Sequence, residues 1–156
     1  MCSSDLGAAR RLGRAIALEL AAHGHDLAIH CRGSRDEALA TAAEAEKRGV
    51  RAAVFPADLA DEAACRALVP AVCERFGRLD AVVNNASTFA YDNVDSFSYA
   101  AMETHWRANT GPAVLLAQAL HAHLAARDGR GSGWPGRARA PPARVRSRGP
   151  GGGRRR

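Results

Sequence analysis

The strongest structural signal in the sequence is Gly7-Ala-Ala-Arg-Arg-Leu-Gly13, which is followed directly by Arg14-Ala-Ile-Ala-Leu-Glu-Leu-Ala-Ala-His-Gly24. Two glycines six residues apart precede a segment whose apolar residues recur at four-residue spacing, which predicts an amphipathic helix. Gly24 predicts its end. Backbone N–H groups at such a helix start can donate to a diphosphate. The alternative is a plain glycine turn, which is common before helices of every kind.

Composition indicates a globular chain with a distinct C-terminal segment. The 156 residues are enough for one domain, and 47% of them are hydrophobic. Residues 131–156 hold eight of the 22 basic residues and none of the 16 acidic ones, so the net charge of +6 comes from this segment. There is no signal-peptide core and no run of about 18 apolar residues. We therefore expect a cytoplasmic protein with no membrane partner.

The cysteines and histidines do not predict a metal site. The four cysteines form no C-x-x-C pair, and we interpret Cys65 and Cys73 as core residues. The two His-x-His pairs, at residues 23–25 and 121–123, have side chains that diverge on a helix. We interpret all four histidines as surface residues.

Short apolar segments alternate with helical ones along the rest of the chain. The expected strands are residues 26–31, 52–55 and 79–83, and the expected helices are residues 34–48, 61–76 and 97–126. Ser34 to Glu37 reads as a capping box, Pro70 should kink its helix or begin a new turn, and the last helical region should be interrupted near Gly111-Pro112. This alternation predicts an α/β fold of the Rossmann type, a doubly wound parallel sheet. Residues 1–6 have only one strong apolar residue beside the turn, so we expect the first strand to be missing or replaced.

Four further groups of residues occur in a fixed order. They are Gly7 with Gly13, Asp58 with Leu59, Asn84 to Ser87, and Asn109. In this order and spacing they resemble the short-chain dehydrogenase/reductase family, and within it pteridine-reductase-like and 3-oxoacyl-acyl-carrier-protein-reductase-like members. Two positions depart from the family pattern of the glycine turn. Leu6 replaces a threonine, and Arg11 replaces the middle glycine, as in pteridine-reductase-like sequences.

The resemblance implies roles for these residues. The glycine turn holds the diphosphate, Asp58 with Leu59 caps the adenine, and the Asn84–Ser87 segment lines the nicotinamide ribose. Asn109 occupies the place of the helix asparagine of the catalytic tetrad, which holds a water in the proton relay. For Asn84–Ser87 an ordinary turn is the competing interpretation. The predicted cofactor-binding residues are Gly7, Arg10, Arg11, Leu12, Gly13, Arg32, Ser34, Asp58, Leu59, Asn85, Ala86 and Ser87, and Asn109 is the predicted catalytic residue.

The end of the second strand predicts NADP(H) as the cofactor. NAD enzymes place a carboxylate there for the ribose 2′-hydroxyl, whereas a 2′-phosphate needs cations and hydroxyls. The strand ends in His30-Cys31-Arg32-Gly33-Ser34, and no acid stands at this end. A guanidinium forms forked, charge-assisted bonds to phosphate, and Ser34 adds a hydroxyl at a helix start. Arg10 or Arg11, close to the predicted diphosphate turn, also favours NADP(H). The alternative is that Arg32 is a solvated loop residue and Ser34 only a cap.

The proton-donating motif of the family, Tyr-x-x-x-Lys, is absent. The chain has one lysine, Lys47, and its tyrosines, Tyr91 and Tyr99, both follow it. In the family the tyrosine protonates a carbonyl or imine substrate during hydride transfer, and the lysine lowers its pKa. We therefore interpret the chain as an inactive fragment of an NADP(H)-dependent oxidoreductase. The resemblance implies that full-length relatives act on a small-molecule substrate. It also makes self-association along the long helix plausible, and the sequence does not decide this point.

Three segments follow from this interpretation. Residues 1–6 are a non-native or incomplete start, and residues 7–128 are a partial NADP-binding domain that lacks everything after the fourth strand and its helix. Residues 129–156 are an Arg/Gly/Pro-rich tail whose composition predicts disorder. We hypothesise that the reading frame is lost near residues 128–131. The alternative function is a non-catalytic binding protein whose arginine-rich tail engages nucleic acid.

Overall fold

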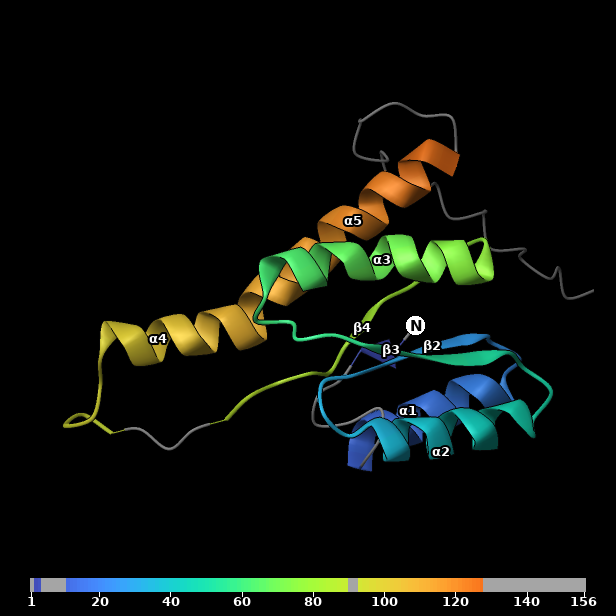
Figure 1. The fold of residues 1–156 in the computed structure, drawn as a ribbon, viewed down its shortest axis with the longest axis horizontal. Helices are drawn as coiled ribbons and strands as arrows, with labels where there is room; N and C mark the ends of the chain where they lie inside the picture. The colour runs from blue at the N-terminus through green and yellow to red at the C-terminus, as the bar shows by residue number, and fades with distance from the viewer. Residues whose placement is uncertain (1, 4–10, 90–92, 128–156) are drawn as a thin grey trace, which may run out of the picture.

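Four parallel strands form one sheet in the order β3-β2-β1-β4, and helices cover both of its faces (Figure 1). The computed structural model describes residues 2–3, 11–89 and 93–127, and for residues 2, 3 and 11 only the backbone. The strands are β1 Cys2–Ser3, β2 Leu27–Cys31, β3 Ala52–Pro56 and β4 Val83–Asn84; the helices are α1 Arg11–Ala22, α2 Arg35–Glu46, α3 Glu62–Phe76, α4 Tyr99–His105, the π-helix η1 Trp106–Thr110 and α5 Gly111–Arg127. The predicted doubly wound α/β arrangement is confirmed.

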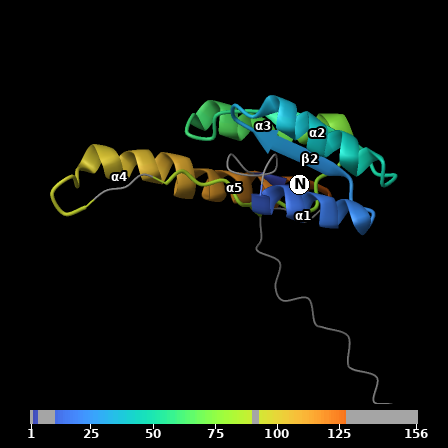
Figure 2. The same ribbon diagram turned by 90° about the horizontal axis from the view of Figure 1, so that it is seen from below.

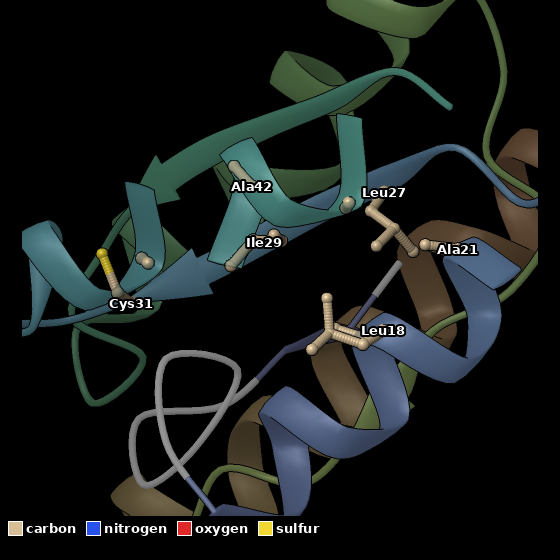
Figure 3. Close-up of a cluster of buried hydrophobic side chains, with 9 residues drawn as sticks. Leu18, Ala21, Leu27, Ile29, Cys31 and Ala42 are labelled. Atoms are coloured by element: carbon tan, nitrogen blue, oxygen red, sulfur yellow. The ribbon is translucent and has the colours of Figure 1, made fainter. Parts of the chain in front are cut away.

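All five residues of β2 are buried, because the strand lies inside the sheet with helices on both sides. It pairs with β3 along its whole length, from Leu27 opposite Ala52 to Cys31 opposite Pro56. On one face, α1 and α2 pack on β2 (Figure 3). Leu18 and Ala21 of α1 approach Leu27, and these residues are at most 7% exposed.

The other face of the sheet is covered by α3 and α5, which pack against each other (Figure 1). Ala28 of β2 points into this second layer, beside Leu68 and Val72 of α3. Leu116 of α5 is fully buried there. Since successive strand residues face opposite sides, Leu27 and Ala28 supply the two cores in turn.

A first strand of two residues is present, so of the two predicted alternatives, missing or replaced, the first is wrong. Cys2–Ser3 form the strand β1 between β2 and β4, with Cys2 opposite Ile29 on one side and Val83 on the other. Strand pairing is made by backbone groups, and therefore a short segment without a run of apolar residues can still occupy a position between two other strands. The strand is only two residues long.

The fourth strand begins later than predicted. β4 covers Val83–Asn84 rather than residues 79–83, and β1 is its partner in the sheet. The backbone N–H of Leu79 donates to His123 Nε2 on α5 at 3.2 Å instead of to a strand. A strand can form backbone hydrogen bonds only where a neighbouring strand lies beside it. Since β1 has two residues, it can pair with only two residues of β4.

Glycines end the helices as predicted. Gly24, Gly49 and Gly77 have φ between 78° and 88°, a conformation that glycine adopts without steric cost. The N–H of Gly77 donates to the carbonyl of Cys73 and closes α3. The same helix runs through Pro70 without a break, so no new turn begins there.

The predicted interruption near Gly111-Pro112 takes the form of a π-helical turn. In η1 the N–H of Gly111 donates to the carbonyl of Trp106, five residues back. Pro112 has no N–H to continue the ordinary ladder, which explains the wider turn just before it. The helices α4 and α5 thus form one long region, and α4 extends beyond the sheet (Figure 2).

Several predictions lie outside the described residues. These are the cofactor contacts predicted for Gly7 and Arg10 and the non-native start predicted for the segment after β1 up to residue 6. The predicted disorder and nucleic-acid binding of residues 129–156 also lie outside them. Among the helices of the described part, none has the length and apolarity needed to cross a membrane.

Candidate functional site

A small hollow lies where β2, β3 and β4 end. It is lined by Arg32 after β2, by Asp58, Leu59 and Ala60 after β3, by Ala86, Ser87 and Thr88 after β4, and by Ala108 of η1. The carboxyl ends of parallel strands meet at one edge of a sheet, where the crevice of an open α/β fold binds its ligand. The tertiary structure therefore brings together three groups of residues that are spread over more than fifty positions of the sequence.

Arg32 and Ser34 lie at the β2 side of this edge. Arg32 is exposed and lines the hollow, and Ser34 is the residue before α2. The hydroxyl of Ser34 makes no capping hydrogen bond, so the predicted capping box does not form. Its ψ of 59° is not the extended value of a capping residue, which takes the hydroxyl away from the helix N–H groups. The Ser34 side chain is thus not engaged by the helix that it precedes.

The loop after β3 is held by its own aspartate. Asp58 Oδ1 accepts from the N–H of Ala60 at 3.0 Å, and the carbonyl of Asp58 accepts from the N–H of Asp61. At the strand end, the N–H of Ala57 donates to the carbonyl of Cys31 and ties this loop to β2. Leu59 is 7% exposed and anchors the loop in the core. These contacts fix the floor of the hollow without a ligand.

Asn109 holds the segment after β4 in place. Its Oδ1 accepts from the N–H of Thr88 at 2.6 Å, and its Nδ2 donates to the carbonyl of Thr88 at 2.9 Å. This two-point contact uses one acceptor and one donor of the amide and sets the path of Ala86 and Ser87 along the hollow. Asn109 belongs to the π-helical turn η1, which positions it toward this segment.

The structure gathers part of the predicted site. Arg32, Asp58, Leu59, Ala86 and Ser87 line one hollow, and the half-buried Asn85 adjoins them. Gly13 is buried in α1, whereas Leu12 is 64% exposed at the start of that helix. The predicted contacts of Gly7, Arg10 and the Arg11 side chain fall outside the described residues.

Three lining residues were not predicted. Ala60, Thr88 and Ala108 border the hollow. Each directly follows or precedes a predicted residue in the sequence, so their neighbours were the only available signal. Their small side chains carry no chemistry that a sequence pattern could indicate.

The prediction for the second His-x-His pair is wrong at His123. This residue is partly buried between α3 and α5, where its Nε2 accepts from the N–H of Leu79 and its Nδ1 lies 3.4 Å from Cys73 Sγ. Burial raises the pKa of the Cys73 thiol, and Arg127 opposes this effect. Cys65 is fully buried as predicted, and Cys73 partly so. In the described part of the chain no group of three or more possible ligands could hold a metal ion.

Comparison with known proteins identifies the family. The family model for short chain dehydrogenases matches residues 6–132, which include every element after β1. The chain belongs to the short-chain dehydrogenase family. This confirms the resemblance predicted from the glycine turn, the Asp58-Leu59 pair, the Asn84–Ser87 segment and Asn109.

Several short-chain dehydrogenases are similar in sequence. The 3-oxoacyl-[acyl-carrier-protein] reductase FabG of Staphylococcus aureus is 40% identical over 80 residues, which are 51% of this chain and 32% of that protein. The 1-cyclohexenylcarbonyl-CoA reductase of Streptomyces collinus is 34% identical over 112 residues, which are 72% of this chain and 40% of that protein. This chain therefore spans about a third of the first of these relatives.

Solved structures of short-chain dehydrogenases share the fold. One from Burkholderia cenocepacia in complex with NADP has a TM-score of 0.73 and 36% identity, covering 78% of this chain and 49% of that one. FolM alternative dihydrofolate reductase 1 from Brucella suis, also in complex with NADP, has a TM-score of 0.72 and 36% identity, covering 79% and 50%. The match extends over about half of each neighbour.

Proposed function

We propose that this chain is the NADP(H)-binding half of a short-chain dehydrogenase, with the hollow at the carboxyl edge of the sheet as the adenosine end of the site. The observation that carries the proposal is the convergence of Arg32, Asp58, Leu59 and Ser87 on one hollow. Ligands of open α/β sheets bind at this edge. In full-length relatives the reaction is hydride transfer between the nicotinamide and a carbonyl or imine of a small molecule.

The residues after β2 fit a 2′-phosphate. Arg32 offers a planar, permanently charged donor group at the border of the hollow. Ser34 makes no capping bond, so its hydroxyl is available to a phosphate oxygen beside the start of α2. From Arg32 to Ser34 there is no carboxylate to accept from a ribose 2′-hydroxyl. Both solved relatives described above were crystallised with NADP, which supports the same choice.

The other predicted site residues would contact the remaining parts of the cofactor. Asp58 and Leu59 border the adenine, and Asn85, Ala86 and Ser87 continue toward the nicotinamide ribose. The residues predicted for the diphosphate are Arg11, Leu12 and Gly13 at the start of α1, whose backbone N–H groups would donate to it, together with Gly7 and Arg10, which lie outside the described residues. Asn109 positions the segment after β4 through Thr88, and its role of holding a water in the proton relay stays a prediction.

The chain as given should bind the cofactor without completing the reaction. The sequence given contains no Tyr-x-x-x-Lys, the motif whose tyrosine protonates the substrate oxygen or nitrogen in the family. We therefore expect no consumption of NADPH with ketone or imine substrates. Steady loss of NADPH absorbance that depends on substrate would contradict this part of the proposal.

Cofactor titration tests the binding part. NADPH fluorescence should rise on addition of the chain, and NADH should bind more weakly. Arg32→Ala should weaken NADPH binding by about tenfold or more while leaving NADH binding unchanged, because only NADPH carries the 2′-phosphate. Arg66→Ala, on the exposed side of α3, is the control and should change neither. Equal affinity of the Arg32 variant for NADPH would refute the assignment.

A further inference from the structure

The buried strand β2 carries a histidine among apolar residues. His30 is 1% exposed and lies between Ile29 and Cys31, which are also buried. Successive strand residues face opposite sides, so His30 faces the layer of α3 and α5, as Ala28 does. Burial of an imidazole costs free energy unless its polar atoms are hydrogen-bonded. A specific hydrogen-bond partner is therefore expected for this ring.

That partner is the loop that leaves β3. His30 Nε2 lies 2.8 Å from the carbonyl oxygen of Ala57, 27 residues further along the chain. A carbonyl oxygen can only accept, so Nε2 carries the hydrogen and donates it. The N–H of Ala57 donates in turn to the carbonyl of Cys31 at 3.0 Å. Two consecutive residues of β2 thus hold both backbone hydrogen-bonding groups of Ala57.

This double contact orients the residue that follows. The peptide bond between Ala57 and Asp58 is trans and planar, so a fixed Ala57 carbonyl also fixes the direction of the Asp58 N–H. Asp58 lines the cofactor hollow, and its Oδ1 accepts from the N–H of Ala60 at 3.0 Å. A carboxylate has further acceptor positions beyond this one bond. The contact of His30 therefore reaches a side chain at the border of the hollow.

We propose that His30 is a positioning residue of the cofactor site, which acts through Ala57 to hold Asp58 against the adenine. The inference rests on the NADP(H) site proposed above, in which Asp58 borders the adenine. A carboxylate at that border can accept from the exocyclic amino group of adenine. His30 does not line the hollow, so its effect on binding passes through the backbone of Ala57.

Recognition of the adenine amino group gives a readout that packing alone would not change. Hypoxanthine carries a carbonyl oxygen in place of this amino group, so it offers Asp58 no donor there. The unaltered chain should therefore bind NADPH about tenfold more tightly than the hypoxanthine analogue of NADPH. This preference should fall when Asp58 loses its fixed orientation. Both ligands carry the 2′-phosphate, so Arg32 contributes equally to each.

Titration of both ligands into three variants of the full chain tests the inference. His30→Met fills the space with an apolar side chain and should reduce the preference to about twofold or less. His30→Gln restores an N–H donor and should recover most of it. Val72→Ala, in the core of the same layer, is the control, and it should lower stability but keep the preference. An unchanged preference in His30→Met, no recovery in His30→Gln, or an equal loss in Val72→Ala overturns the inference.

Amide exchange without ligand separates this inference from the proposed function. In His30→Met the N–H of Ala60, which donates to Asp58, should exchange faster, whereas that of Leu27, bonded to Arg51, should not. If the unaltered chain binds no NADPH, the proposed function fails and this exchange still decides the role of His30. Unchanged exchange at Ala60 overturns the inference.

Nitrogen-15 spectra of the histidine rings in the unaltered chain decide the matter if His30→Met fails to fold. We expect the His30 ring to carry its hydrogen on Nε2, as donation to Ala57 requires. We also expect this resonance to shift when NADPH binds. A ring with its hydrogen on Nδ1, or no shift with NADPH bound, overturns the inference.

Discussion

The side chain of Asn109 forms two hydrogen bonds with the backbone of Thr88: its Oδ1 accepts from the Thr88 N–H at 2.6 Å, and its Nδ2 donates to the Thr88 carbonyl at 2.9 Å. This contact joins a π-helical turn to the segment that leaves β4. Among the side chains that the sequence motifs single out, Asn109 thus has a structural role that the hydrogen bonds explain: it shapes the border of the hollow at the ends of β2, β3 and β4.

Asn109→Ala should destabilise the chain and weaken NADPH binding together. The change leaves the N–H and the carbonyl of Thr88 without their partner in a half-buried place, which costs roughly 2 kcal/mol. Chemical denaturation measures the first effect and NADPH titration the second. Thr110→Ala, at the exposed neighbouring position, is the control and should lie within about 0.5 kcal/mol of the unaltered chain. An unchanged denaturation midpoint for Asn109→Ala would contradict the role.

Ser34→Ala should reduce NADPH affinity with little effect on stability. Its hydroxyl makes no capping bond. Ser98 and Asp61, by contrast, do cap their helices, with Ser98 Oγ accepting from Ala101 at 3.1 Å and Asp61 Oδ1 from Ala63 at 2.9 Å. Ser98→Ala and Asp61→Ala should each lower the free energy of unfolding by about 1 kcal/mol. A comparable loss for Ser34→Ala would mean that this serine acts as a cap in solution.

The Asp26–Arg51 pair should contribute to acid sensitivity. Hydrogen bonds from Arg51, aided by its charge, hold the pKa of Asp26 below its usual value. The stability from this pair is complete above the unfolded-state pKa of about 3.9 and is lost as pH falls through the lower folded-state value. Both side chains are partly exposed, so the effect should stay below about 1 kcal/mol.

Urea denaturation between about pH 2 and pH 6 measures this contribution. Asp26→Asn should flatten the acid limb of the stability profile, and Arg51→Gln should flatten it to a similar degree. The double variant should add little to either single change in that limb, since the two residues act as a pair. Full additivity would show that the pair does not link pH to stability.

His123→Ala should destabilise the packing of α5 on α3. The change removes the acceptor of the Leu79 N–H and the contact with Cys73 Sγ, at a cost of about 1 to 3 kcal/mol. His121→Ala is the matched control on the same helix, because His121 is exposed, and it should cost less than about 0.5 kcal/mol. Thermal unfolding of both variants compares them. Equal losses would place the two histidines in the same surface role.

Sequence alone determined the local elements and their class. The apolar runs gave β2 and β3 nearly at their observed bounds, and the ends of three helices followed from Gly24, Gly49 and Gly77. These features depend on residues close together in the chain, namely strand-forming runs and a left-handed conformation that favours glycine. The family also followed, because its motifs combine residue type with spacing.

Tertiary structure decided what depends on distant partners. Cys2–Ser3 form a strand because β2 and β4 offer backbone groups on both sides, a property that its own side chains do not encode. Likewise, Leu79 lies outside the fourth strand, and its N–H donates to His123, 44 residues away, a contact that no local pattern encodes. The convergence of Arg32, Asp58 and Ser87 has the same origin: parallel strands end at one edge, and only the folded sheet sets those ends side by side.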